Sequence, residues 1–131
     1  MRRFSYEEYN IAVLGATGAV GREMLKVLFE RRFPIQDIHA LASARSAGSH
    51  VPFGDRELIV EEATDASFVG MDIVLGAAQA DLARKFAPAI VKSGAVFIDN
   101  SSAFRMNDDV PLIVPEINAL DAKKHRGIIS N

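Results

Sequence analysis

Three glycines spaced three residues apart are the part of this sequence best suited to chemistry. Gly15, Gly18 and Gly21 stand in the run GATGAVG, directly after the apolar segment 11–14. In such a run the first glycine allows a sharp turn, the second lets the backbone approach a ligand, and the third lets a helix pack closely. The N–H groups that begin the helix favour an anion. The pattern therefore predicts a loop that binds a pyrophosphate.

The residues around the glycines decide between a binding loop and a simple tight turn. The spacing is GxxGxxG rather than the commoner GxGxxG, and three glycines alone often mark only a turn. However, the segment 11–14 is strand-like, and Val20, Met24 and Leu28 recur at helical spacing after the run. Because strand, loop and helix follow in this order, the sequence favours a dinucleotide-binding unit.

The polar loop 43–49 offers a second candidate group of side chains. In dinucleotide-binding sheets an acid after the second strand contacts the ribose 2′-hydroxyl of NAD, whereas an arginine accommodates the 2′-phosphate of NADP. This loop contains no acid and offers Ser43, Arg45 and Ser46. A guanidinium flanked by hydroxyl donors suits a phosphate. The alternative is an exposed arginine in a flexible loop, but the glycine loop upstream favours NADP.

Arg105 follows a strand-like run and a serine-rich turn. In that place it could bind a substrate carboxylate or phosphate bidentately. It could equally pair with Asp108 or Asp109, and spacing alone slightly favours the ion pair. The side chains of residues 100–102 could offer donors to a ligand, but they more often satisfy the backbone of the turn.

Cysteine and histidine usage limits the chemistry further. The sequence has no cysteine, which excludes disulfides, thiolate metal sites and a cysteine nucleophile within these 131 residues. His39, His50 and His125 stand apart, with no partner at ligand spacing. We therefore expect surface or loop histidines and no metal site.

Size and charge bound the organisation and the partners. A chain of 131 residues that is 49% hydrophobic fits one globular domain and no second one. The net charge of −2, from 15 basic and 17 acidic residues, suggests neither nucleic acid nor a membrane as partner. Residues 1–9 are expected to be a leader. Glu7 and Glu8 stand where a signal peptide needs its apolar core, so we expect a cytoplasmic protein.

Strand-like and helical segments alternate along the chain. This order predicts an α/β fold over residues 10–131: a Rossmann-like, doubly wound, mostly parallel sheet with helices on both faces. The expected strands are the segments 11–14, 38–42, 57–61, 71–75, 95–99 and 128–129. The expected helices follow Gly18 and cover 80–93 and 121–125, with a short helical turn after Thr64.

Three details of these elements follow from residue types. Pro88 predicts a kink, or two short helices, within 80–93, because its ring clashes with the carbonyl of Arg84 in a regular helix. Prolines confine the segment 110–118 to edge or irregular structure. The nearly all-apolar run 95–99 predicts a strand covered on both faces.

Five segments together resemble bacterial aspartate-semialdehyde dehydrogenases, in the same order and across nearly the whole chain: GATGAVG, LASARSAG, DNSSAFRM, VPLIVPEIN and HRGIISN. The resemblance implies NADPH-dependent reduction of L-aspartyl 4-phosphate to L-aspartate 4-semialdehyde, on the branch toward lysine, threonine and methionine. It also implies roles for particular residues. After the turn at Gly15, the pyrophosphate would contact Thr17, Gly18, Ala19 and Val20; the 2′-phosphate would contact Ser43, Arg45 and Ser46; and the substrate phosphate would contact Arg105.

The same resemblance implies groups that these residues do not contain. In that family a Pro-Asn-Cys segment follows the position of Asn131, and the other catalytic side chains lie in a second domain. We therefore expect a piece of a homodimeric parent, with no catalytic residue of its own, that binds coenzyme without turnover. The segment 76–79 departs from the family, and Gln79 in place of glycine is expected to narrow the coenzyme pocket.

Three alternatives to the dehydrogenase domain remain open at this point. They are a cysteine-less paralogue of the family, a non-enzymatic dinucleotide-binding redox sensor, and an α/β scaffold that binds no nucleotide. Saturable binding of NADPH or NADH separates the last of these from the others.

Overall fold

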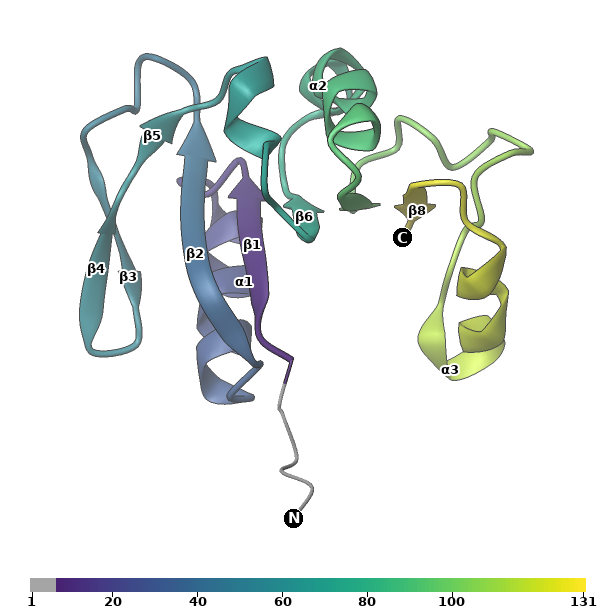
Figure 1. Cartoon of the computed structure of the whole chain (residues 1–131), viewed down its shortest axis with the longest axis horizontal. Coiled ribbons are helices and arrows are strands. Elements are labelled where there is room, and N and C mark those ends of the chain that lie inside the picture. The colour runs from purple at the N-terminus through teal and green to yellow at the C-terminus, as the bar shows by residue number, and fades with distance from the viewer. Residues whose placement is uncertain (1–6) are drawn as a thin grey trace.

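Residues 7–131 are described by the structure, a computed structural model, and they form a six-stranded sheet with helices on both faces (Figure 1). Its strands lie in the order β5-β2-β1-β6-β7-β8, and every neighbouring pair is parallel. The strands are β1 (Tyr9–Leu14), β2 (Ile35–Ala42), β5 (Glu61–Glu62), β6 (Ile73–Gly76), β7 (Val96–Asp99) and β8 (Ile128–Ser130). The predicted Rossmann-like, doubly wound fold is confirmed.

The two long helices, α1 (Ala19–Glu30) and α2 (Ala80–Lys92), cover opposite faces of this sheet. The apolar residues of β1 alternate between two core clusters: Val13 packs with Leu25 of α1, whereas Leu14 packs with Phe86 of α2. Side chains of a strand point to opposite faces in turn, so β1 needs a helix on each side. The result is a central strand that is buried on both faces.

The predicted leader, residues 1–9, lies mostly outside the described residues. Within them, Tyr9 already belongs to β1, since its N–H donates to the Pro34 carbonyl at 2.9 Å. Its ring also packs 5.9 Å from that of Phe33. The ordered sheet therefore begins one residue before the predicted domain boundary.

A hairpin that the sequence did not predict lies beside β2. Its strands, β3 (His50–Phe53) and β4 (Arg56–Ile59), pair antiparallel around the turn Gly54-Asp55. The predicted strand 57–61 is confirmed for residues 57–59, which belong to β4, but it is not one strand: β4 ends at Ile59, and the chain re-enters the main sheet as β5. The change of sheet occurs at Val60, whose side chain is buried and whose N–H donates to the Ser49 carbonyl.

The predicted division of 80–93 into two short helices is wrong, because α2 continues through Pro88 as one helix. The alternative, a kink at Pro88, stays a prediction. Pro88 and Arg84 both lie on the exposed face of α2. The carbonyl that loses its intrahelical donor can therefore bond to water, and Ala83, Phe86 and Ile90 keep the buried face intact.

The remaining short elements follow local capping. The helical turn predicted after Thr64 is confirmed as η1 (Asp65–Phe68), where the Thr64 N–H donates to Ser67 Oγ at 2.9 Å. The segment 110–118 is irregular only up to Val114; it then forms α3 (Pro115–Asn118), because a proline suits the first position of a helix. The predicted helix 121–125 is replaced by η2 (Ala119–Lys124).

One prediction about burial needs correction. Phe97 of β7 is fully buried on the α2 side, but Val96 and Ile98 on the other face are only half-buried. The helix on that side, α1, packs beside β1 and the hairpin and leaves this part of the sheet partly open. The apolar run is therefore not covered on both faces by the described residues.

Candidate dinucleotide-binding site

The loop after β1 is fixed by backbone contacts that need its first glycine. Gly15 has φ 86°, and the N–H groups of Gly15 and Ala16 both donate to the Leu41 carbonyl, at 2.9 and 3.1 Å. A Cβ at Gly15 would lie 2.7 Å from the Ala78 nitrogen. The turn therefore brings the end of β1 into contact with both the end of β2 and the loop after β6.

The other two glycines meet opposite surroundings. A Cβ on Gly21 would overlap the Gly15 carbonyl oxygen, so this glycine lets α1 pack on its own loop. A Cβ on Gly18 would meet only that same oxygen, at 3.7 Å. Gly18 is exposed and no side chain of the described residues caps α1 there. Open space thus lies beside uncapped N–H groups at a helix N-terminus, which suits an anion.

A groove of about 460 Å³ opens from this loop along the carboxyl ends of β1, β2 and β6. The strand order changes direction between β1 and β6, and ligands of doubly wound sheets bind at such a switch point. One wall consists of the two loops and the end of β2: Leu14, Gly15, Thr17, Gly18, Ala42, Ser43, Ala44, Ala77, Ala78 and Gln79. The other wall consists of the end of β5, the residue after it, and α2: Glu62, Ala63, Leu82, Lys85 and Phe86.

The structure brings some of the predicted coenzyme contacts together and leaves others outside the groove. Gly15, Thr17, Gly18 and Ser43 line it. Ala19 and Val20 begin α1, and both line a different hollow on the sheet's other side.

The predicted phosphate-binding loop extends beyond the groove wall. The Ser46 N–H donates to the Ser43 carbonyl at 3.0 Å, which makes a turn with Arg45 near its tip. Arg45 is exposed and has no hydrogen-bond or ion-pair partner within residues 7–131. The guanidinium is accessible to a ligand that extends past Ser43.

Sequence reasoning missed the far wall of the groove. Lys85 lies with its Nζ 5.2 Å from the centroid of the Phe86 ring, and Leu82 stands one turn earlier on the same helix. Glu62 belongs to the groove wall because β5 pairs with the end of β2, where Ala42 lies opposite Glu62. The four-residue spacing of Leu82 and Phe86 could have indicated the helical wall, but the sequence carries no signal for the β2–β5 pairing. Gln79 lines the groove as expected.

Arg105 lies at the end of the sheet beyond β7 and does not line the groove. Its Nε donates to the Asn131 backbone oxygen at 3.1 Å and its Nη2 to the Asn100 carbonyl at 3.0 Å. It makes no ion pair with Asp108 or Asp109, so that alternative is wrong. The guanidinium is exposed, and three of its five N–H donors remain for a ligand.

The serine-rich turn before Arg105 serves its own backbone, as favoured from the sequence. Ser101 donates both its N–H and its hydroxyl to the Asp99 carboxylate, at 3.0 and 2.6 Å. Its hydroxyl oxygen in turn accepts from the Ala103 N–H at 3.1 Å. The turn is thus held from within, starting at the last residue of β7.

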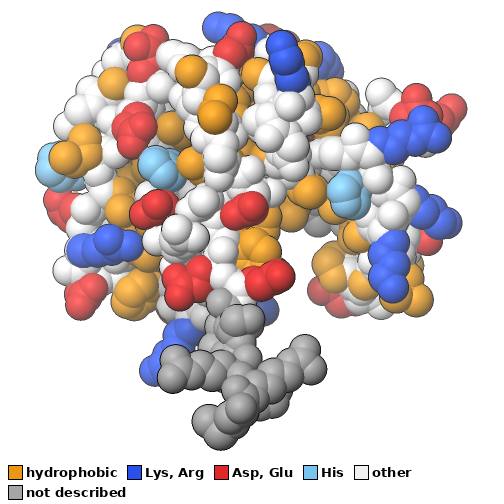
Figure 2. All heavy atoms as spheres, viewed as in Figure 1, with side chains coloured by type: hydrophobic (Ala, Val, Ile, Leu, Met, Phe, Trp, Pro, Cys, Tyr) orange, Lys and Arg blue, Asp and Glu red, His pale blue; other side chains and the backbone are white. Residues whose placement is uncertain are grey.

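The histidines occupy peripheral positions with local partners. His39 contacts Glu61 at 3.4 Å and His50 contacts Glu57 at 3.1 Å, while His125 Nδ1 accepts from the Gly127 N–H. Within residues 7–131 there is no group of three or more His, Cys, Asp or Glu side chains that could hold a metal ion. No helix among those residues has the length and apolar character needed to cross a bilayer. Both acidic and basic side chains are spread over the face in Figure 2.

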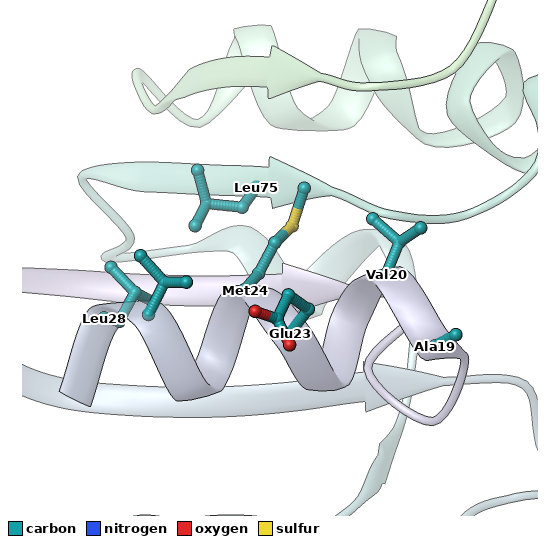
Figure 3. Close-up of a pocket in the computed structure, with 7 residues that line it drawn as sticks. Ala19, Val20, Glu23, Met24, Leu28 and Leu75 are labelled. Atoms are coloured by element: carbon teal, nitrogen blue, oxygen red, sulfur yellow. The ribbon is translucent and has the colours of Figure 1, made fainter. Parts of the chain in front are cut away.

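A second hollow, of about 450 Å³, lies between α1 and β6 on the opposite face of the sheet (Figure 3). Its lining is almost entirely apolar and includes Val20, Met24, Val27, Leu28 and Leu75, with Glu23 as the one charged residue. It offers no set of donors for a pyrophosphate, so the groove at the strand ends is the better candidate for a dinucleotide.

Comparison with known proteins agrees with this geometry. A family model described as "Semialdehyde dehydrogenase, NAD binding domain" matches residues 10–125. The chain belongs to this family. It is 49% identical over 122 residues to the aspartate-semialdehyde dehydrogenase of Bacillus subtilis (strain 168), covering 93% of this chain and 35% of that protein. It is 48% identical to the Synechocystis enzyme of the same name, covering 92% and 36%.

A solved structure of the same family has the same fold. Aspartate semialdehyde dehydrogenase II of Vibrio cholerae, crystallised as a complex with ASA, superposes with a TM-score of 0.88 at 41% identity. The match covers 95% of this chain and 42% of that one. This member of the semialdehyde dehydrogenase family therefore spans well under half the length of the relatives it matches.

Proposed function

We propose that this chain is the NADP-binding domain of an aspartate-semialdehyde dehydrogenase. The observation that carries the proposal is the groove at the β1–β6 switch point, entered over an uncapped helix N-terminus beside Gly18. Relatives that bear this enzyme name match more than 90% of the chain. Those names favour a dehydrogenase over the redox sensor and over a scaffold without nucleotide.

In this proposal the coenzyme lies along the strand ends. Its pyrophosphate contacts the backbone of Thr17, Gly18, Ala19 and Val20, after the turn at Gly15. Its adenosine occupies the groove between Ser43 and α2. The 2′-phosphate of NADP extends past Ser43 to Ser46 and Arg45, whose accessible guanidinium supports the choice of NADP over NAD. When bound, NADPH supplies a hydride. The residues of the two loops bind and orient the coenzyme.

The substrate end of the proposal concerns Arg105 and the parent protein. Arg105 binds the phosphate of L-aspartyl 4-phosphate, since its free N–H donors can neutralise a leaving group. The parent, a cytoplasmic homodimer, reduces this substrate to L-aspartate 4-semialdehyde for lysine, threonine and methionine biosynthesis. The nucleophile and proton-transfer groups come from outside residues 1–131, which contain no cysteine.

Arg45→Ala tests the coenzyme assignment. We expect weaker NADPH binding by about 1.5–3 kcal/mol, the value of a hydrogen bond to a charged group, and little change for NADH. Calorimetric titration of the 131-residue chain with each coenzyme measures both. Arg31→Ala is the matched control, because Arg31 lies at the C-terminal end of α1, away from the groove.

Two outcomes would contradict this assignment in different ways. Equal losses for NADPH and NADH would reject Arg45 as the 2′-phosphate ligand. A lack of saturable binding of either coenzyme by the unmodified chain would reject coenzyme binding by this domain altogether.

A further inference from the structure

Asp99, the last residue of β7, is a charged group in an unusual place. Its side chain is fully buried, and no lysine or arginine within the described residues pairs with it. Burying a carboxylate is costly unless hydrogen bonds compensate. Here the compensation comes from Ser101 alone, through its N–H to Oδ1 and its hydroxyl to Oδ2.

The neighbouring strands leave room for this carboxylate on the α2 face. In register, Asp99 stands between Gly76 of β6 and Ser130 of β8. A Cβ on Gly76 would lie 2.8 Å from Asp99 Oδ1 and 2.7 Å from the ring of Phe97. The glycine therefore provides the space in which the carboxylate reaches the turn that follows it.

Hydrogen bonds and the short backbone segment 99–105 together connect Asp99 with Arg105. The Ser101 hydroxyl, held by Asp99, accepts from the Ala103 N–H and so shapes the turn. Arg105 then donates to the Asn100 carbonyl and to the Asn131 backbone oxygen. The Asn131 N–H donates to the backbone carbonyl of Asp99 at 2.9 Å, so both backbone partners of Arg105, Asn100 and Asn131, are held at the end of β7.

We propose that Asp99 is a positioning residue for Arg105. The buried carboxylate fixes the turn 100–104 through Ser101, and the turn presents the guanidinium with two N–H donors committed and three free. A guanidinium held in this way loses less conformational freedom when it binds a tetrahedral oxyanion. The inference rests on the proposed role of Arg105 as a phosphate ligand.

The experiment uses the whole 131-residue chain and follows the Arg105 Nε–H resonance by NMR. Hydrogen exchange at Nε reports whether the guanidinium is held, and titration with inorganic phosphate reports binding. The variants are Asp99→Asn and Ser101→Ala, with Ser101→Thr to restore the hydroxyl. Ser102→Ala is the control, because Ser102 is an exposed neighbour that makes no side-chain hydrogen bond to the described residues.

We expect Asp99→Asn and Ser101→Ala to speed Nε–H exchange and to weaken phosphate binding by up to about tenfold, because a guanidinium that is no longer held loses more conformational freedom when it binds. Ser101→Thr keeps the hydroxyl, so it should keep both the slow Nε–H exchange and the phosphate affinity of the unmodified chain. A merely structural role would instead appear mainly as a lower melting temperature, with exchange and affinity unchanged. If Nε–H exchange and phosphate affinity stay as in the unmodified chain while Ser101 or Asp99 is replaced, the positioning role is overturned.

A failure of the proposed function gives a different result. If phosphate does not shift the Arg105 resonance in the unmodified chain, Arg105 is not a phosphate ligand under these conditions. The positioning role is then decided by Nε–H exchange alone, which requires no ligand.

Discussion

The three glycines of the first loop show how one residue type serves different needs within seven positions. Gly15 and Gly21 are enclosed by backbone, whereas Gly18 faces open space. Substitutions at these positions should therefore separate effects on folding from effects on binding. An added methyl group overlaps protein backbone at Gly15 and Gly21, whereas at Gly18 it enters the open space proposed for the ligand.

Gly18→Ala should fold as the unmodified chain does, because φ is −77° there and the nearest atom to a Cβ is 3.7 Å away. It should bind NADPH about tenfold more weakly, since the methyl group fills the space where a pyrophosphate approaches. Thermal unfolding and NADPH titration measure the two effects. As a control, Gly21→Ala should lose about 1–3 kcal/mol of stability through overpacking. Unchanged NADPH affinity in Gly18→Ala would place the pyrophosphate elsewhere.

Lys85 should contribute to coenzyme affinity although it lies far from the glycine loop in sequence. Lys85→Met keeps the apolar stem against Phe86 and removes the charge, so we expect NADPH binding to weaken by about 1 kcal/mol. Fluorescence titration measures the change, and Lys92→Met on the last turn of α2 is the control. If the two variants bind alike, Lys85 contributes no contact to the coenzyme.

At the scale of elements, the end of α1 carries local strain. The Phe33 N–H donates to the Leu28 carbonyl and the Arg32 N–H to the Phe29 carbonyl, both at 3.1 Å, which is the Schellman arrangement. It requires a left-handed residue at Arg32, where φ is 52°. Glycine normally fills this position because a side chain there is strained.

Arg32→Gly should therefore stabilise the chain by about 0.5–1 kcal/mol in chemical denaturation. Arg31→Gly serves as the comparison, since φ is −83° at Arg31 and glycine relieves nothing there. A loss of stability in Arg32→Gly would mean that contacts of the arginine side chain outweigh the backbone strain.

The elements that the sequence predicted well are those whose pattern is local. β1, α1 and β7 follow from apolar runs and helical spacing, and the cap at Thr64 follows from residue type. The two short helices predicted at Pro88 are not found, and the sequence pattern did not reveal that Arg84, whose carbonyl loses its donor, lies on the solvent side of α2. The hairpin was missed because β3 has only four residues and contains Pro52, which argues against a strand, although its residues alternate between exposed and buried. Its packing also depends on a distant contact, between the rings of Phe29 and Phe53, which lie 5.4 Å apart.

The residues of the candidate site also divide into those with a local sequence pattern and those that only long-range packing brings together. The places of the loops after β1 and β2 were predictable because each follows a strand-like run and is rich in glycine or serine. Their contacts with a coenzyme stay a prediction. Glu62 and Lys85 were not predictable, since their approach to the groove depends on a two-residue strand pairing and on the placement of α2. The partners of Arg105 likewise depend on β8 lying beside β7.

For the whole molecule, the partly open face of the sheet exposes apolar surface. The hollow between α1 and β6 in Figure 3 is lined by Val20, Met24, Val27, Leu28 and Leu75. A contiguous apolar surface on a folded chain should bind a hydrophobic dye such as anilinonaphthalene sulfonate without any loss of structure.

Val27→Gln should roughly halve the dye fluorescence, because it places an amide in the hollow at a position that is 36% exposed. Val114→Gln, at a position 43% exposed outside the hollow, should leave the signal unchanged. Circular dichroism confirms that both variants stay folded. Equal fluorescence from both variants would show that the dye binds elsewhere.

The strand order also governs how this sheet can assemble on the ribosome. β1 pairs with β2 soon after it is made, but its other edge waits for β6, where Ile11 meets Ile73. At about 5–20 residues per second, the intervening stretch takes roughly 3 to 12 s to translate. Throughout that interval the largely apolar strand β1 has an unpaired edge, open to nascent chains on neighbouring ribosomes. Synonymous codons that slow elongation between Leu14 and Ile73 would lengthen this exposure without altering a single amino acid.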